Sequence, residues 1–324
     1  MSTRTRALAV QQMPARAGAQ PRQIEYAGLT WLDLIQPTVA QVTALRDRFG
    51  FDTLALEDVL SQIQRPKLDV YAENEYLFLV LHFPIFDKAD RVASAGEVDI
   101  FVGPDYVITA HDGRLKPLRR LFAAAATDER ARAQLMGRGP GYLLYRIIDA
   151  LMKACFPMLY RVDDHLARIE ANLFGRNARA IARELSFARR DIIALRGILR
   201  PNLPVIRMLE EHRHVFLRLD QAVYIGDLAD GLHKLWDLLA EQKEVVEGLN
   251  ATLDSLLVHR INQALQILMA IVAVLLPLIL VANIFAMNVD LPLAQYPSAF
   301  AILILVMIGL AAGAVALLRY KDRI

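Results

Sequence analysis

The sequence predicts an α+β domain followed by a long stalk helix and two C-terminal transmembrane helices. Three observations lead to this fold class. The segment from Ile261 to Asn288 has no charged side chain and exceeds the about 20 residues that a helix needs to cross a bilayer core of roughly 30 Å. A second uncharged segment, Leu291 to Leu318, follows almost at once. The preceding residues alternate between strand-like and helix-like patterns.

The composition excludes several classes of protein. A net charge of +2 with 22% charged residues does not indicate a nucleic-acid partner. Cys155 is the only cysteine and lies among apolar residues, which excludes a disulfide or thiolate metal site within one chain and predicts a packing role. Residues 1–22 contain arginines, no acid and no apolar run, so we expect a disordered basic tail in preference to a mitochondrial transit peptide, and no secretory signal.

Residues 23–205 are expected to form a cytoplasmic domain with an α/β lobe and further helices. The run TWLDLIQPT predicts a strand that ends where a helix begins at Thr38. Tyr76 to Phe86 is a strong strand pattern, and Glu97 to His111 predicts a hairpin that turns at Gly103. From about residue 115 to residue 200, apolar residues recur three and four positions apart, which predicts successive helices.

Residues 206–260 are predicted to be a stalk helix region. From about Val223 the helical pattern continues without proline until Pro277, and a helix that reached Phe285 would have about 60 residues and a length of about 90 Å. Its cytoplasmic half is amphipathic with heptad-like spacing. We therefore expect it to pack against copies of itself or against other helices of the lobe.

The C-terminal part is predicted to have four segments: a first transmembrane helix with its turn at 261–288, an extracytoplasmic loop at 289–297, a second transmembrane helix at 298–318 and a basic cytoplasmic tail at 319–324. Because the connection is so short, both termini must lie on one side. Basic residues flank the pair of helices on that side: His259, Arg260, Arg319, Lys321 and Arg323. The positive-inside rule places that side in the cytoplasm.

One face of the first transmembrane helix carries a stripe with steps of three and four residues. It consists of Asn262, Leu265, Met269, Val272, Leu276, Ile279 and Asn283. An asparagine that faces lipid is costly, so this face should contact protein or water. Two interpretations fit the pattern: a helix–helix interface joined by asparagine, and a pore lined by symmetry-related copies.

The turn after this helix reads IFAMNVDLP and resembles the Gly-Met-Asn turn of the CorA family of divalent-cation channels. Other stretches resemble the family in the same order: a Gln-Arg-Pro-Lys run before a central strand, the middle helix GPGYLLYRIIDALMKACFPMLYRVDDHLARIE, and the stalk-to-membrane junction HRINQALQILMAIVAVLLPLILV. The order of parts is also similar, from the α/β lobe to the basic tail.

The resemblance implies a homopentamer in membrane lipid, with the first helices around a pore and the stripe lining it. The selectivity filter would then be Ala286, Met287 and Asn288. A ring of amide oxygens suits Mg²⁺, which gives up its water reluctantly, because the ring can hold the hydrated ion without trapping it. Asp290 would concentrate cations at the entrance or, alternatively, be an exposed turn residue or a cap of the second helix.

The resemblance also implies a cytoplasmic Mg²⁺ sensor. Asp87 and Asp227 match positions at which members of the family place acids of neighbouring subunits on either side of a regulatory ion. Mg²⁺ between these carboxylates would favour the closed pentamer. Without the resemblance, each residue is an ordinary solvated aspartate.

Several positions depart from the family pattern. Ala286 replaces the signature glycine and is tolerable only if its φ stays negative. Phe285 replaces the usual tyrosine, Ile279 stands where many members have threonine, and Asn283 stands where glycine is frequent. We expect Asn283 to supply a second polar ring and Ile279 a dry constriction, with a hydrophobic gate from Leu265 to Ile279.

The expected function is Mg²⁺ influx, with Co²⁺ or Ni²⁺ as further substrates, gated by cytoplasmic Mg²⁺. A Zn²⁺ transporter of the same superfamily and a non-conducting, cation-binding membrane sensor are alternatives. His212 and His214 are of a residue type that binds Zn²⁺, but they lack paired ligands and are expected to be surface residues. No enzyme motif is found, and the Ala/Arg/Leu-rich composition predicts a bacterial plasma membrane.

Overall fold

The structure is a computed structural model that describes residues 21–61, 64–86, 93–175, 177–211, 221–287 and 298–321. The chain divides into two compact units. The first comprises Met1–Asn172 and Arg179–Gly248, and the second comprises Leu173–Ala178 and Leu249–Ile324. The expected basic tail lies outside the described residues except for its last two positions.

A six-stranded sheet forms the centre of the first unit. Its strands are β1 (Arg22–Tyr26), β2 (Leu29–Ile35), β3 (Lys67–Tyr71), β4 (Tyr76–Phe86), β5 (Ala93–Val102) and β6 (Tyr106–His111). Their order is β1-β2-β6-β5-β4-β3, and only the β2–β6 pair is parallel. The predicted strand and hairpin are confirmed by β4 and by the β5–β6 pair, where the Gly103 N–H donates to the Tyr106 carbonyl at 3.0 Å.

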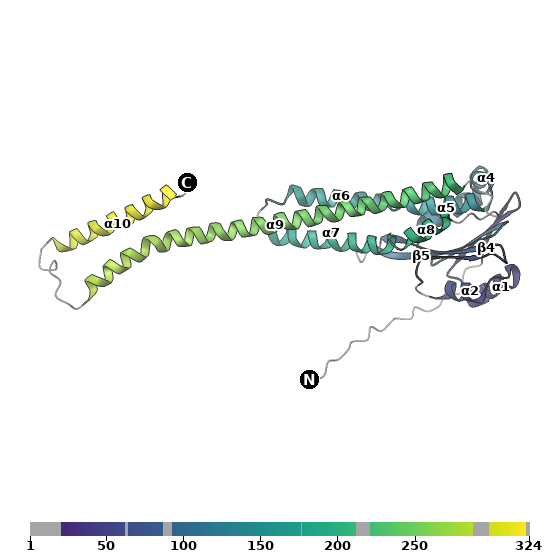
Figure 1. Ribbon diagram of the computed structural model, residues 1–324, viewed down its shortest axis with the longest axis horizontal. Helices are drawn as coiled ribbons and strands as arrows, with labels where there is room; N and C mark the ends of the chain where they lie inside the picture. Colours follow the sequence, from purple (N-terminus) through teal and green to yellow (C-terminus); the bar gives the residue numbers. More distant parts are fainter. Residues whose placement is uncertain are drawn as a thin grey trace, which may run out of the picture. The chain divides into compact units, whose positions relative to one another are not determined.

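Helices cover both faces of this sheet (Figure 1). On one face lie α1 (Val39–Phe49) and α2 (Thr53–Leu60). On the other lie α3 (Lys116–Thr127), α4 (Glu129–Met136), α5 (Pro140–Lys153) and α8 (Asn202–Glu211). The predicted start of α1 is confirmed: the Thr38 hydroxyl accepts from the Gln41 N–H, and the Gln41 side chain accepts from the Thr38 N–H. Two aromatic residues, Phe51 and Phe101, stack at 4.4 Å in the core beneath α1 and α2.

A buried polar network fixes the parallel strand pair. Asp33 of β2 is 1% exposed and accepts from the Thr109 hydroxyl at 2.8 Å, from His111 Nε2 at 3.1 Å and from Arg22. Because His111 Nδ1 accepts the Gly113 N–H, Nε2 carries the proton that is donated to Asp33. Burial raises the pKa of Asp33, but the hydrogen bonds from its partners outweigh burial, and the pKa lies below its ordinary value.

Three long helices lie side by side in the first unit: α6 (Phe156–Ala171), α7 (Ala178–Leu199) and the first part of α9 (Gln221–Ala286) (Figure 1). Gln242 of α9 donates to the Leu159 carbonyl of α6 at 2.9 Å, and Arg196 of α7 donates to the Leu239 carbonyl at 3.4 Å. The stalk pattern was expected to pack on its own copies or on helices of the lobe. This structure shows the second arrangement.

The helical pattern between residues 142 and 175 is divided into α5 and α6. Pro157, near the start of α6, has no N–H to donate to the carbonyl of Lys153, where α5 ends. Cys155 lies at the junction and is 1% exposed, which confirms its expected packing role. Burial raises the pKa of its thiol to about 12.

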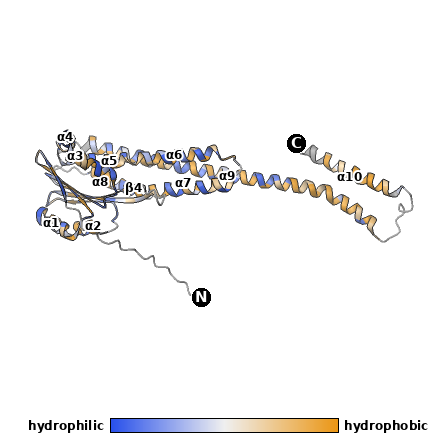
Figure 2. Ribbon diagram, turned by 180° about the vertical axis from the view of Figure 1, so that it is seen from behind, coloured by the Kyte–Doolittle hydropathy of each residue, from blue (hydrophilic) through white to orange (hydrophobic). Residues whose placement is uncertain are grey.

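The second unit contains the apolar helices. The long helix α9 has 66 residues, and Figure 2 shows its C-terminal half and α10 (Ala299–Lys321) coloured as hydrophobic. Within the described residues, the span Val223–Ala286 is the one helix long and apolar enough to cross a membrane, and α10 contributes a shorter apolar stretch, Phe300–Ala316. The prediction of one very long helix is therefore confirmed, and it begins within two residues of the predicted start.

One carboxyl group in the sheet is buried without a full set of partners. Asp99 of β5 is 4% exposed, and its Oδ1 has no hydrogen-bond partner among the described residues. Burial, followed by the nearby charges of Glu97 and Asp58, raises its pKa well above the ordinary value. The folded protein therefore binds this proton more tightly than the unfolded chain does, so the stability that Asp99 contributes falls as the pH rises above its unfolded-state pKa.

Replacing Asp99 by asparagine should remove this pH-dependent penalty. We expect Asp99→Asn to unfold at a higher temperature than the unmodified protein at pH 8 and to lose most of that advantage at pH 4. A difference of about 1 kcal/mol in the free energy of unfolding corresponds to a shift of roughly 2–4 °C in the unfolding temperature. Thermal unfolding of the purified full-length protein measures this difference. Asp105→Asn, at an exposed site, is the control; an equal pH effect in both variants would contradict the assignment.

Candidate functional site

The seven-residue stripe lies on the apolar part of α9 and is not covered by its own chain. Its five apolar members are between 48% and 62% exposed: Leu265, Met269, Val272, Leu276 and Ile279. The two asparagines at its ends, Asn262 and Asn283, are exposed as well. The stripe is therefore available to contact lipid, water or another copy of the chain.

The length and the winding of the stripe follow from helix geometry. Asn262 and Asn283 are 21 residues apart, which is about 32 Å at 1.5 Å per residue and close to the thickness of a hydrocarbon core. The spacing repeats every 3.5 residues, whereas a straight helix has 3.6 residues per turn. On a straight helix the direction of the stripe therefore rotates around the helix axis by about 20° in each heptad, or about 60° over its length.

Pro277 interrupts the hydrogen bonding of α9 within this stripe. Its ring has no N–H, so the carbonyl of Ala273, one turn earlier, loses the backbone donor that it would have in a regular helix. In hydrocarbon such a carbonyl needs another donor or a water molecule. The apolar middle of the helix therefore contains one polar backbone group next to the stripe residues Val272 and Leu276.

The predicted filter begins where α9 ends. Ala286 is the last helical residue, and the Met287 N–H lies 3.4 Å from the Ile284 carbonyl. Ala286 is not among the non-glycine residues with positive φ in the described chain. The condition under which alanine can replace the signature glycine is thus met. Two residues of the predicted site, Asn288 and Asp290, lie outside the described residues.

Asp227, the predicted sensor residue on α9, is exposed and hydrogen-bonded within its own chain. The Tyr145 hydroxyl of α5 donates to Asp227 Oδ2 at 2.9 Å. Burial and this hydrogen bond raise the pKa of Tyr145 above its ordinary value, so the hydroxyl keeps its proton and remains a donor. The second predicted sensor residue, Asp87, lies outside the described residues.

The surroundings of Asp227 are compatible with a divalent cation but do not enclose one. Asp227 forms no ion pair with a described residue, and its Oδ1 has no hydrogen bond there. Asp230 lies almost one turn further along α9 and is also exposed. Among the described residues no group of three acids, histidines or cysteines could hold a metal ion, so a bound ion here would need water or a second chain as ligands.

A tyrosine cluster supports the Tyr145–Asp227 contact and was not predicted from the sequence. Tyr224 lies on α9, 5.0 Å between ring centroids from Tyr145 and 5.3 Å from Tyr142. Arg138 Nη1 donates to the Tyr224 hydroxyl at 2.7 Å. Apart from the tyrosines' aromatic character, the sequence gives no signal for this cluster, because its members are about 80 positions apart.

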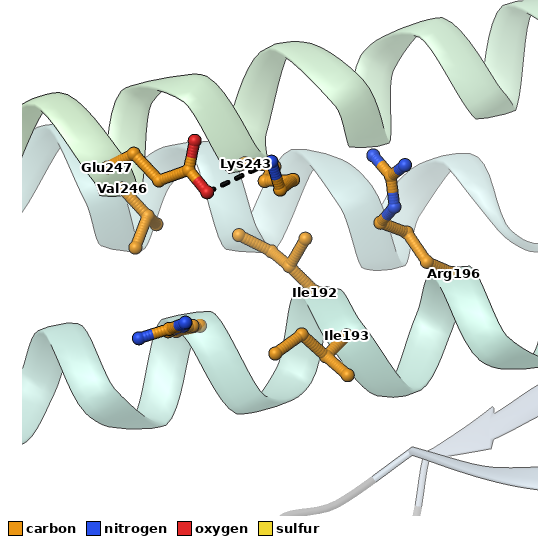
Figure 3. A pocket seen from close by; sticks show the side chains of 7 residues that line it. Ile192, Ile193, Arg196, Lys243, Val246 and Glu247 are labelled. Atoms are coloured by element: carbon orange, nitrogen blue, oxygen red, sulfur yellow. Dashed lines mark ion pairs between the residues drawn. The ribbon is translucent and has the colours of Figure 1, made fainter.

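A cavity of about 150 Å³ lies between α7 and α9 in the first unit (Figure 3). Its apolar lining residues are Ile192, Ile193 and Val246, and its charged lining residues are Arg189, Arg196, Lys243 and Glu247. Lys243 pairs with Glu247 at 2.9 Å, and the Arg196 guanidinium lies 4.2 Å from the Trp236 ring. The net positive charge of this lining makes it unsuitable for a cation, and the cavity was not predicted from the sequence.

Known proteins resemble this chain over nearly its whole length. Residues 26–320 match a family described as CorA-like Mg²⁺ transporter protein. YfjQ of Bacillus subtilis is 29% identical over 264 residues, which cover 80% of this chain and 78% of that protein. The cobalt/magnesium transport protein CorA of Thermotoga maritima is 25% identical over 282 residues, which cover 86% and 76%. The solved CorA magnesium transporter of Methanocaldococcus jannaschii has the same fold, with a TM-score of 0.79, 21% identity and coverage of 91% and 92%.

Because Ala286 is helical, a glycine there should weaken the helix end. We expect Ala286→Gly to lower the stability by about 0.5–1 kcal/mol, since glycine loses more backbone freedom than alanine on entering a helix. Thermal unfolding in detergent measures this, with Ala282→Gly, one turn earlier in α9, as the matched control. A higher unfolding temperature for Ala286→Gly would mean that residue 286 adopts a positive φ.

Proposed function

Because the chain belongs to the family of CorA-like Mg²⁺ transporter proteins, we propose that it is a homopentameric channel that carries Mg²⁺ into the cytoplasm of a bacterium, with Co²⁺ and Ni²⁺ as further substrates. The observation that carries the proposal is the exposed stripe on α9 that leads directly into the Ala-Met-Asn turn. Both termini lie in the cytoplasm, since basic residues flank both apolar helices on that side.

In the proposed pentamer, five α9 helices surround the pore and turn their stripes inward, while the α10 helices lie outside in lipid. The exposure of the stripe in one chain supports this arrangement, because asparagines at both ends would be costly in contact with lipid. The apolar character of α10 suits a position in contact with hydrocarbon.

The proposed filter is the ring formed by Ala286, Met287 and five copies of Asn288. Mg²⁺ holds its water tightly, so neutral amide oxygens would bind the hydrated ion through its water shell. A weak interaction lets the ion leave again, which conduction requires. Asp290 in each chain would raise the local cation concentration at the entrance.

Below the filter, the stripe would form a polar ring at each end and five apolar rings between them. Asn283 gives a second polar ring and Ile279 a dry constriction, and the residues from Leu265 to Ile279 form a hydrophobic gate that closes when water leaves it. The membrane potential drives a divalent ion inward with about 4.6 kcal/mol per 100 mV, twice the value for one charge.

Cytoplasmic Mg²⁺ would regulate this channel through Asp227 of one subunit and Asp87 of its neighbour. The two carboxylates repel each other when no cation lies between them, so an ion bound there favours the closed pentamer, and its loss favours opening. The exposed position of Asp227 and its open Oδ1 support this role. The Tyr145 hydroxyl would hold the carboxylate in place without neutralising its charge.

Ion uptake into proteoliposomes tests the proposed conduction. We expect uptake of Mg²⁺ but not of Na⁺, and we expect Asn288→Ala to abolish Mg²⁺ uptake because the amide ring is lost. Co²⁺, Ni²⁺ and Zn²⁺ are offered separately, and Gln263→Ala, which leaves the stripe and the filter unchanged, is the control. Uptake of Zn²⁺ without Mg²⁺ would indicate the zinc-transporting branch, and no uptake by intact oligomers would indicate a cation sensor.

Substitution of the sensor residue should shift the regulation of uptake. We expect Asp227→Asn to raise the internal Mg²⁺ concentration that half-inhibits uptake by about tenfold, or about 1.4 kcal/mol, because a charged ligand is lost. Tyr145→Phe keeps the carboxylate and should produce a clearly smaller shift. Equal half-inhibiting concentrations in Asp227→Asn and the unmodified protein would exclude Asp227 from the regulatory site.

A further inference from the structure

The connection between α6 and α7 places an exposed phenylalanine next to the start of the apolar segment of α9. Leu173 and Phe174 are neighbours in this connection, but Leu173 is 4% exposed and Phe174 is 74% exposed. The carbonyl of the next residue, Gly175, accepts a hydrogen bond of 2.8 Å from Arg260 Nη2 of α9. All of these residues belong to the second unit.

This hydrogen bond fixes the level of the connection along α9. Arg260 directly precedes Ile261, where the uncharged segment begins. If that segment fills the hydrocarbon core, Arg260 lies at its cytoplasmic edge. The headgroup region adds roughly 5–8 Å on each side of the core, so a group bonded to Arg260 lies within reach of the headgroups.

The chemistry of the connection suits an anionic lipid surface. Single exposed apolar side chains are common, so the exposure of Phe174 is significant only because of its position beside Arg260. Aromatic rings concentrate at the level of the headgroups, and basic side chains there attract anionic lipids. The sequence from Asn172 to Arg179 contains no acidic residue, and both His259 and Arg260 lie at the same level of α9.

We propose that the α6–α7 connection docks on the cytoplasmic headgroup layer of the membrane, with Phe174 inserted among anionic lipids beside Arg260. This docking rests on the proposed insertion of α9. It provides a lipid contact outside the transmembrane helices. The connection would then contact the membrane through Phe174 and α9 through the hydrogen bond from Arg260 to the Gly175 carbonyl.

Spin labels attached to single cysteines test this contact in the full-length protein. The native Cys155 is 1% exposed and its thiol pKa is raised to about 12, so it stays unlabelled, and the unmodified chain treated with the reagent verifies this. A nitroxide is attached to Phe174→Cys in vesicles of phosphatidylcholine and phosphatidylglycerol. Its accessibility is measured by power saturation with oxygen, which concentrates in lipid, and with the neutral chelate nickel ethylenediaminediacetate, which stays in water.

Two further labelled variants give reference values. Val39→Cys in α1 is at a site of similar exposure, 67%, and gives the value for water. Ile271→Cys, on the side of α9 away from the stripe, gives the value for lipid and tests the insertion of α9 independently. We expect the oxygen-to-nickel ratio at residue 174 to be severalfold above that at residue 39 and below that at residue 271.

Three results would overturn the proposal, and they can be told apart. A ratio at residue 174 equal to that at residue 39, with a lipid value at residue 271, would place the connection in water although α9 is inserted. Low accessibility to both reagents would mean that another copy of the chain covers Phe174. A water value at residue 271 would remove the insertion of α9 and the docking together.

Discussion

Every feature of the proposed channel depends on the hydrogen bonding along the backbone of one helix. A chain segment can cross hydrocarbon only if its own peptide groups pair with one another, and the 66-residue helix α9 does this except at the Ala273 carbonyl, which lacks a donor at Pro277. A helix of this length needs support in water, which α6 and α7 supply through contacts such as Gln242 with the Leu159 carbonyl. The first unit thus stabilises the N-terminal part of α9, and in the proposed channel the membrane would stabilise the rest.

Local sequence patterns predicted the elements of the fold well. The strand Tyr76–Phe86, the Thr38 cap and the long helix are governed by neighbouring residues, so periodicity and capping chemistry suffice to find them. The strand order is different. Asp33 pairs with Thr109 across 76 positions, and a parallel pair of this kind has no local signal. The break between α5 and α6 was not predicted, because the stretch from Gly139 to Glu170 was interpreted as one helix.

The part of the candidate site that lies within one helix was predictable, because local sequence patterns suffice to find it. The stripe from Asn262 to Asn283 is a property of one helix and could be recognised by counting residues. The contact of Tyr145 with Asp227 and the cavity beside Arg196 join helices that are far apart in the chain, so only the fold reveals them. The effect of alanine at position 286 depends on a backbone angle. Composition cannot supply that angle, whereas the structure does.

The drift of the stripe has a consequence for the shape of any pore that it lines. Straight, parallel helices would turn only part of the stripe toward a common axis, because its ends differ by about 60° in direction. Copies of α9 that keep the whole stripe at the axis must wind around one another with a left-handed twist. Tightening or relaxing that twist would rotate the two ends of each helix, and with them Asn262 and Asn283, in opposite senses about the helix axis. The side chains that an ion meets would therefore depend on the winding of the bundle as well as on its width.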